Sequence, residues 1–305
     1  MASFVVAALY HFARIPDFAA WREPLRAVCA QAGVRGTLLL AAEGINGTIA
    51  GSRSGIDAVL AHLRADPRFA TLEHKESLAP EIPFARLKIK LKREIVTMGV
   101  PDIDPSRSAG TYVDPAQWND LLTNPDVLVI DTRNAYEVRV GTFHRAVSPQ
   151  TESFREFPDY VERELRGQEQ RPIAMFCTGG IRCEKATAYL REQGFEQVYH
   201  LRGGILKYLE EMPATQSLWA GECYVFDERV AVGHGLRPGL TRRCDACGEP
   251  LTAEEQGSAD YDPGIHCPRC VTGLTPARRA MLQMRRSQQG PSAATDVTPA
   301  DIDRE

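Results

Sequence analysis

Residues 171–185 read RPIAMFCTGGIRCEK, and this segment decides the fold of the middle of the chain. The apolar run Ile173 to Phe176 predicts a buried strand, and the run from Cys183 to Gln193 predicts a helix. The loop predicted between them consists of Cys177, Thr178, Gly179, Gly180, Ile181 and Arg182. Because its amides and the helix N-terminus would point at one spot, this loop predicts an anion cradle around Cys177.

The cradle favours the thiolate of Cys177, which is the reactive form of a cysteine. Amide dipoles and the charge of Arg182 would stabilise an exposed thiolate, while Gly179 and Gly180 let the backbone curl around the sulfur. The alternative is a buried free cysteine after a central strand, which requires neither the glycines nor the arginine. We therefore interpret Cys177 as a nucleophile.

Four residues separate Cys177 from Arg182, and this spacing resembles the loop of rhodanese-type sulfurtransferases. The loop of cysteine phosphatases is one residue longer and forms a wider cradle for phosphate. The shorter loop favours a cysteine persulfide over a phosphocysteine.

The composition is that of an ordinary globular protein. A length of 305 residues suggests two or three domains, with 43% hydrophobic and 25% charged residues. The net charge of −4 neither implies nor excludes a nucleic-acid partner, because a local basic patch can coexist with it.

The sequence predicts a cytoplasmic protein without a membrane partner. The apolar run Phe4 to Leu9 is short and lacks the basic leader of a signal peptide. No stretch approaches the roughly 18 apolar residues of a membrane span. Four of the eight cysteines form two CxxC pairs, which in a reducing compartment indicates metal binding rather than disulfides.

Residues 1–99 predict an α+β sandwich of the ferredoxin-like or acylphosphatase-like type, because strands and helices follow the order β-α-β-β-α-β. The predicted strands lie at 4–10, 36–42, 48–50, 71–78 and 86–98, the helices at 16–32 and 54–65, and a turn at 43–47. Pro16 is expected to open the first helix and Ser54 to cap the second.

Residues 100–113 indicate a linker, and residues 114–212 a rhodanese-like domain whose alternating strands and helices predict a parallel sheet covered on both faces. Active sites of such sheets lie beyond the carboxyl ends of the strands, where Asp131 and Cys177 fall. Asp131 and Arg133 are candidates for supporting the cysteine loop, although a structural role is favoured over direct chemistry.

The remaining segments are a connecting stretch at 213–243, a cysteine-rich segment with a basic helix at 244–288, and a polar tail at 289–305 that is predicted to be disordered. Two CxxC pairs can hold one structural zinc ion with no open position for catalysis. The alternative is thiols without metal, or reversible disulfides. The four candidate ligands are Cys244, Cys247, Cys267 and Cys270.

Two further patterns remain open between function and structure. A strand at 86–92 would place four cations on one face, where they could bind tRNA phosphates or keep a solvated edge strand from aggregating. These candidates are Arg86, Lys88, Lys90 and Lys92. Cys183 could resolve a persulfide or sulfenic acid on Cys177, or could be a small residue packed inside the helix.

Six segments together resemble the bacterial rhodanese-domain-containing tRNA uridine hydroxylases over about residues 4–230. They are EGINGT (43–48), RLKIKLKREIVTMG (86–99), DTRNAYEVRVGTF (131–143), FCTGGIRCEKA (176–186), LRGGILKYL (201–209) and WAGECYVFDERV (219–230). The resemblance implies oxygen-dependent 5-hydroxylation of the wobble uridine, with tRNA bound at its anticodon region. It also implies that Cys177 takes the place of the family's catalytic cysteine, as a persulfide intermediate.

Two other functions compete with this one. The first is a sulfurtransferase that moves sulfur from thiosulfate or a protein persulfide, and the second is a non-catalytic rhodanese-like module. Cys177 with Arg182 argues against the module, and the extra N-terminal domain favours a macromolecular substrate.

We find no flavin, haem or iron motif, so a direct attack of the thiolate on C6 of uracil, which activates C5, is our mechanistic hypothesis. The sequence makes no prediction of the oligomeric state or the electron donor.

Overall fold

The computed structural model describes residues 3–289. The chain divides into two compact units, Met1–Gly239 and Leu240–Glu305, and each is described by itself. Among the described residues, no helix is both long and apolar enough to cross a membrane.

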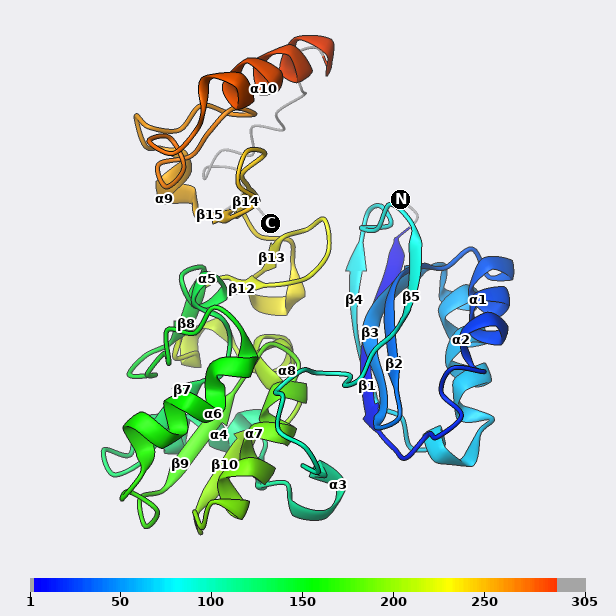
Figure 1. The fold of residues 1–305 in the computed structure, drawn as a ribbon, viewed down its shortest axis with the longest axis vertical. Helices are drawn as coiled ribbons and strands as arrows, with labels where there is room; N and C mark the ends of the chain where they lie inside the picture. Colours follow the sequence, from blue (N-terminus) through cyan, green and yellow to red (C-terminus); the bar gives the residue numbers. More distant parts are fainter. Residues whose placement is uncertain (1–2, 290–305) are drawn as a thin grey trace. The chain divides into compact units, whose positions relative to one another are not determined.

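The first unit begins with an antiparallel sheet that also contains one parallel pair. Its five strands run in the order β4-β1-β3-β2-β5, with β5 parallel to β2. The strands are β1 (Phe4–Phe12), β2 (Arg35–Ala41), β3 (Gly44–Gly51), β4 (His74–Ala79) and β5 (Leu87–Leu91). Helices α1 (Arg22–Gln31) and α2 (Arg53–Arg64) cover one face, and a short 3-10 turn, η1 (Pro67–Phe69), follows α2 (Figure 1). This arrangement confirms the predicted α+β sandwich.

The two faces of this sheet differ in character. Side chains that alternate along β1, including Val5, Ala7 and Leu9, belong to the apolar core under the helices. The residues between them, together with Lys75 of β4 and Lys90 of β5, project from the opposite face, because strand neighbours alternate sides. We call this second surface the open face of the sheet.

The turn predicted at residues 43–47 is wrong. The structure turns at residues 42–43 and resumes as β3 at Gly44. A Cβ on Gly44 would lie 2.0 Å from the carbonyl oxygen of His11, and Gly44 has φ +143°. A Cβ on Gly47 would lie 2.0 Å from the Thr37 carbonyl oxygen. The glycines therefore allow neighbouring strands to approach closely, and they do not mark a turn.

Three predicted boundaries also differ. The first helix starts at Arg22 and not at Pro16, because residues 16–21 form successive turns. Ser52, and not Ser54, caps α2 by accepting a hydrogen bond from the Gly55 amide at 3.1 Å. The strand predicted to reach residue 98 ends at Leu91, since the chain then leaves the sheet edge.

A second sheet, all parallel, confirms the prediction for the middle of the chain. Its strands run in the order β6-β10-β9-β7. They are β6 (Thr111–Val113), β7 (Leu128–Asp131), β9 (Ile173–Phe176) and β10 (Val198–Leu201). The helices of this part are α3 (Pro105–Ser108), α4 (Pro115–Thr123), α5 (Ala135–Val138), α6 (Phe157–Tyr160), α7 (Ile181–Glu192) and α8 (Gly204–Glu211). The helical turns η2 (Phe154–Glu156) and η3 (Val161–Leu165) flank α6. Separate apolar clusters lie on the two faces of the sheet.

Residues 213–239 pack onto this sheet. Strand β11 (Trp219–Gly221) pairs with β8 (Gly141–Phe143), and β12 (Cys223–Tyr224) pairs with β13 (Ala231–Val232). The turns η4 (Ala214–Gln216) and η5 (His234–Leu236) complete the segment. Trp219, Cys223 and Val232 belong to the same core as the central sheet, so the segment is part of the folded unit.

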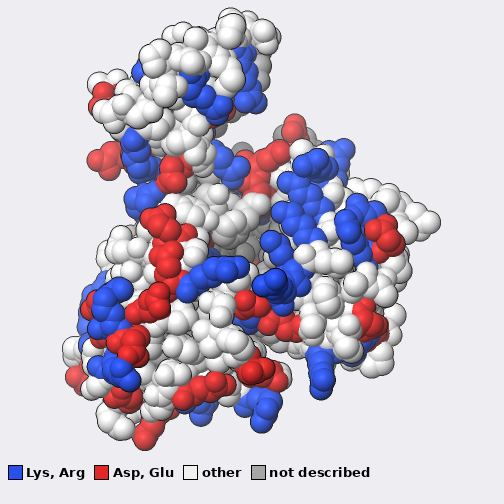
Figure 2. All heavy atoms as spheres, viewed as in Figure 1, with Lys and Arg blue, Asp and Glu red and all other residues white. Residues whose placement is uncertain are grey.

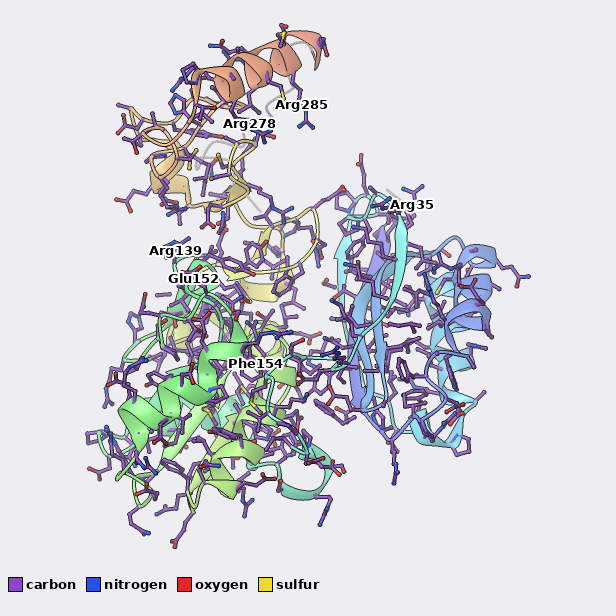
Figure 3. The ribbon with its side chains drawn as sticks, viewed as in Figure 1. Arg35, Arg139, Glu152, Phe154, Arg278 and Arg285 are labelled. Carbon is purple, nitrogen blue, oxygen red and sulfur yellow. The ribbon has the colours of Figure 1, made fainter. Side chains whose placement is uncertain are left out.

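The second unit is small. It contains β14 (Arg242–Arg243), β15 (Pro250–Leu251), α9 (Ala253–Gln256) and α10 (Pro276–Gln289). Figure 3 shows Arg278 and Arg285 on α10, the helix predicted to be basic. The tail predicted to be disordered lies, apart from its first residue, outside the described residues.

Candidate active site and metal centre

The cysteine loop lies at the carboxyl end of β9, beside the end of β7. The amide of Thr132, just after β7, donates to the Phe176 carbonyl at 3.0 Å. Helix α7 begins at Ile181, two residues earlier than predicted, so Ile181 and Arg182 belong to its first turn. Gly180, with φ +105°, makes the bend that allows this, and its amide donates to the Cys177 sulfur at 3.2 Å.

The thiol of Cys177 is acidic although it is buried. Only 1% of Cys177 is exposed, so the expectation of an exposed thiolate is wrong. Burial by itself would raise the pKa of this thiol. A hydrogen bond from Cys183, the positive charge of Arg182 and the amides at the start of α7 outweigh burial and lower the pKa to about 5. Cys177 is therefore a thiolate at neutral pH.

Arg182 acts on the thiolate from a distance, because its guanidinium is bound to Glu137. Two hydrogen bonds of 2.7 Å join Arg182 to the Glu137 carboxylate, and Thr178 Oγ1 donates to the same carboxylate at 3.2 Å. Burial tends to raise the pKa of Glu137, but the charge and hydrogen bonds of Arg182 hold it below its ordinary value. The paired arginine leaves little free positive charge for a phosphate group in this loop.

Glu137 has no role in the sequence-based account. It stands three residues after Asn134, and its carboxylate accepts from the Asn134 amide at 3.2 Å, as in a capping box. The spacing N-x-x-E before an apolar residue was the available signal, although it indicates a helix start and not a partner for Arg182.

Cys183 lies in the same buried cluster as Cys177 and is fully buried. Its sulfur lies 3.5 Å from the hydroxyl of Thr132. Burial and the neighbouring Cys177 raise the pKa of the Cys183 thiol well above its ordinary value. The two cysteines therefore form a pair of one thiolate and one neutral thiol.

Asp131 and Arg133 are joined to each other and not to the cysteine loop. Two hydrogen bonds of 2.8 and 2.6 Å link Arg133 to the Asp131 carboxylate, and both residues are fully buried. Arg133 also donates to the Gly141 carbonyl at 2.6 Å, and Thr142 donates to Asp131 at 2.8 Å. These bonds connect the end of β7 with β8, which fits the structural role that the sequence favoured.

A cavity of about 560 Å³ lies between the cysteine loop and the open face of the N-terminal sheet. Cys177, Thr178, Gly179, Ile181 and Arg182 form its wall on one side. The open face contributes Tyr10, Asn46, Lys75, Lys90 and Lys92, among others. Three aromatic side chains also line the cavity, those of Phe84, Phe226 and Phe154, the last of which is labelled in Figure 3.

Of the four predicted tRNA-binding residues, Lys90 and Lys92 line this cavity, whereas Arg86 and Lys88 do not. All four side chains are exposed. Figure 2 shows Lys and Arg atoms gathered over the part of the N-terminal domain where Figure 1 draws β4 and β5. The edge strand therefore presents its cations at and beside the cavity mouth.

Buried polar contacts attach the N-terminal sheet to helix α7. The ammonium of Lys185, only 2% exposed, lies 2.8 Å from Glu43 and 2.7 Å from Glu94. The next residue back, Glu184, accepts hydrogen bonds from Tyr10 at 3.0 Å and from Tyr112 at 2.7 Å. Sequence reasoning missed these residues, because nothing local indicates that Tyr10 and Glu184 meet across 174 positions.

The four cysteines of the two CxxC pairs come together in the second unit. Their sulfur atoms all lie within 4.8 Å of one another. The hairpin of β14 and β15 carries the first pair, and Cys247 lies 3.7 Å from Cys267 across the cluster. Four thiolates at this spacing can hold a metal ion and are compatible with structural zinc.

We predict that Cys177 titrates with a midpoint near pH 5 and that Cys183→Ala raises this midpoint by about one to two pH units. A hydrogen bond to a charged group contributes about 1.5–3 kcal/mol, and its loss disfavours the thiolate. The measurement is thiolate ultraviolet absorbance against pH, taken as the difference from the Cys177→Ser protein. Cys29→Ala, which alters a cysteine of the N-terminal core, is the matched control. An unchanged midpoint in Cys183→Ala would contradict the prediction.

Two family models match the chain. Residues 4–95 match the UPF0176 acylphosphatase like domain, and residues 114–211 match the Rhodanese-like domain. These matches agree with the two sheets described above and with the predicted fold class.

Curated relatives match over nearly the whole length of the chain. A protein of Agrobacterium fabrum is 59% identical over 285 residues, covering 93% of this chain and 91% of its own. One of Rhizobium etli is 57% identical, covering 93% and 92%. One of Picosynechococcus is 54% identical, covering 95% and 97%. Each is named tRNA uridine(34) hydroxylase. The chain therefore belongs to the tRNA uridine(34) hydroxylase family.

Proposed function

We propose that the protein hydroxylates the wobble uridine of tRNA at C5, with molecular oxygen as co-substrate and Cys177 as nucleophile. The observation that carries this proposal is the acidic Cys177 at the wall of a cavity that a second domain completes. The name shared by full-length relatives supports the same substrate.

The size and surroundings of the cavity suit a single nucleotide of the anticodon loop. Its volume, about 560 Å³, falls within the roughly 300–1,000 Å³ of pockets that enclose small ligands. The wobble base is unpaired in free tRNA, so it can enter without opening a duplex. Lys88, Lys90 and Lys92 would bind neighbouring phosphates, since they are exposed on the strand that borders the cavity.

The thiolate gives the site a way to activate uracil. Attack of the Cys177 sulfur on C6 breaks the C5–C6 π bond and moves the electron pair into an enolate, so that C5 becomes electron-rich. A C5–O bond then forms with oxygen, and loss of the original C5 proton together with the thiolate restores the C5–C6 double bond. One oxygen atom enters the base, and the other leaves as water after two electrons and two protons arrive from an external reductant such as a thiol.

The sulfurtransferase alternative explains less of the molecule. A persulfide on Cys177 fits the length of the loop, but sulfur transfer to a small thiol needs neither the open face of the N-terminal sheet nor its lysines. A tRNA substrate explains both, and it also favours a cytoplasmic location, where tRNA is used.

We further propose that the cysteine cluster holds zinc in a structural role. Four thiolate ligands complete a tetrahedral site and leave no position for a substrate. The ion would stabilise the second unit, whose apolar cluster is small.

The direct test of the function uses purified protein, oxygen, a thiol reductant and unmodified tRNA, followed by mass spectrometry of the nucleosides. We expect 5-hydroxyuridine at the wobble position with the wild type and none with Cys177→Ser, because the serine hydroxyl is not ionised at neutral pH. Cys29→Ser is the control and should hydroxylate normally, because Cys29 belongs to the core of the N-terminal domain. Product formation by Cys177→Ser would refute the role of Cys177.

A second test concerns the basic strand. Replacing Lys88, Lys90 and Lys92 with Ala should weaken tRNA binding. The slope of log binding constant against log salt concentration should become shallower by up to about 3, at roughly 0.7–0.9 per lost phosphate contact. Binding is measured by filter retention at several salt concentrations. Arg163 and Arg166, exposed and paired with glutamates, provide the control substitutions. An unchanged slope would show that these lysines do not contact tRNA phosphates and that the strand is a solvated sheet edge.

A third test concerns the metal. Purified protein should contain zinc, and Cys247→Ala combined with Cys270→Ala should remove it, because two thiolates hold zinc far more weakly than four. Elemental analysis measures the metal, and limited proteolysis should then cut within residues 240–289. Retention of zinc by the double variant would show that these four cysteines are not the zinc ligands. As a control, the pH titration of Cys177 should be the same in the double variant as in the wild type.

A further inference from the structure

Lys75 is a cation of the N-terminal domain that faces the cysteine loop. It lies on β4 opposite Ala8 of β1, so its side chain leaves the open face of the sheet. It lines the cavity that contains Cys177 and also a neighbouring cavity of about 640 Å³. The lysine therefore stands at the boundary between the two spaces.

Two close contacts fix the course of this side chain. Its Nζ lies 5.2 Å from the centre of the Tyr10 ring, within cation–π distance. A Cβ on Gly203 would lie 3.0 Å from Lys75 Cε, so the lysine crosses directly over the Gly203 backbone. The turn at Gly203 backs the cysteine loop, because the Ile205 amide donates to the Cys177 carbonyl at 3.0 Å.

No structural partner neutralises this ammonium. Among residues 3–289, no carboxylate lies within ion-pair distance of Lys75, whereas the buried Lys185 has two. The titratable groups that face Lys75 are Tyr10, Glu73, Cys177, Glu184 and Lys207. Burial lowers the pKa of Lys75, while the negative charge of Cys177 favours the protonated form. An unpaired and partly desolvated cation beside a thiolate is characteristic of a functional site.

We propose that Lys75 is a catalytic residue whose ammonium donates a hydrogen bond to the O4 carbonyl oxygen of the bound uracil and stabilises the charge that forms there when Cys177 adds to C6. This inference rests on the proposed function, and it assigns to the N-terminal domain a residue of the site that contains Cys177. Charge stabilisation by a preorganised donor is a large effect in a water-poor site.

The step is balanced without a redox partner. The S–C6 bond forms, the C5–C6 π bond breaks, and its electron pair ends in the enolate of C5, C4 and O4. Lys75 keeps its proton throughout. In the absence of oxygen, the enolate takes a proton from solvent at C5. Loss of the original C5 hydrogen and of the thiolate then returns uridine with an exchanged hydrogen.

This exchange provides the test. Wild-type protein is incubated without oxygen in deuterated water with an anticodon stem-loop RNA, and mass spectrometry follows deuterium at C5 of the wobble uridine. Lys75→Met should slow the exchange about 100–1,000-fold, the loss expected for one oxyanion donor. Its affinity for the RNA and its thermal unfolding should stay as in the wild type. Lys207→Met is the matched control, because Lys207 lines only the neighbouring cavity and lies 3.6 Å from Glu211.

Lys75→Arg gives an independent readout. The wild-type exchange rate should rise through the pKa of Cys177, about 5, and fall again at high pH, where both Lys75 and the N3–H of uracil lose protons. An arginine stays protonated in this range, so Lys75→Arg should retain measurable exchange and move the alkaline decline to the higher pH at which only the uracil ionises. A structural role for Lys75 would leave the alkaline decline at the pH where the wild type shows it.

The outcomes separate this inference from the proposed function. Exchange by Lys75→Met at the wild-type rate, or a loss matched by an equal loss of RNA affinity, would overturn the role of Lys75 and leave the hydroxylase intact. Hydroxylation without any exchange by the wild type would overturn the addition step and Lys75 with it. Absence of hydroxylation by the wild type in the presence of oxygen and a thiol reductant would overturn the proposed function itself.

Discussion

The ammonium of Lys185, buried between the carboxylates of Glu43 and Glu94, is the contact on which the site depends. A buried charge without a partner costs several kcal/mol, so these three groups must stay together once the unit has folded. Lys185 is on α7, the helix that continues from the cysteine loop. Glu43 precedes β3 of the N-terminal sheet, and its carboxylate also accepts from the Ile95 amide at 2.6 Å. The position of the loop against the sheet is thereby fixed.

This attachment changes what the cysteine loop can do. In isolation, the loop is an acidic thiol at the end of a parallel strand, with its arginine neutralised by Glu137. With the sheet opposite, it becomes one wall of a cavity whose other wall carries Tyr10, Lys75 and Lys90. In the proposed function, reactivity comes from one domain and substrate contacts from the other, so we expect that neither domain hydroxylates tRNA alone.

The local parts of this arrangement could be predicted from the sequence. The strand before Cys177 was found because four apolar residues end at a glycine loop, and the CxxC pairs were found because their spacing is diagnostic. The turn at 43–47 was wrong because glycine indicates both turns and close strand contacts, and only the neighbouring strands distinguish the two.

The contacts between domains had no local signal. Lys185 and Glu184 follow the cysteine loop in sequence, but their partners lie up to 174 residues away. Lys75 is one charged residue in a polar strand, and only the fold reveals that it faces a thiolate. Burial of Cys177 was missed for the same reason, since members of its core cluster such as Met98 and Ile130 lie elsewhere in the chain.

The proposed function depends on addition of the Cys177 sulfur to C6 of the wobble uridine within this shared cavity. The most direct measurement uses an anticodon stem-loop RNA with 5-fluorouridine at the wobble position, because fluorine at C5 hinders release of the thiolate and traps the adduct. We expect a covalent complex that survives denaturation and that peptide mass spectrometry localises to Cys177. The Cys177→Ser protein should not form this complex. A wild-type protein that hydroxylates ordinary RNA but gives no adduct with the fluorinated one would contradict it.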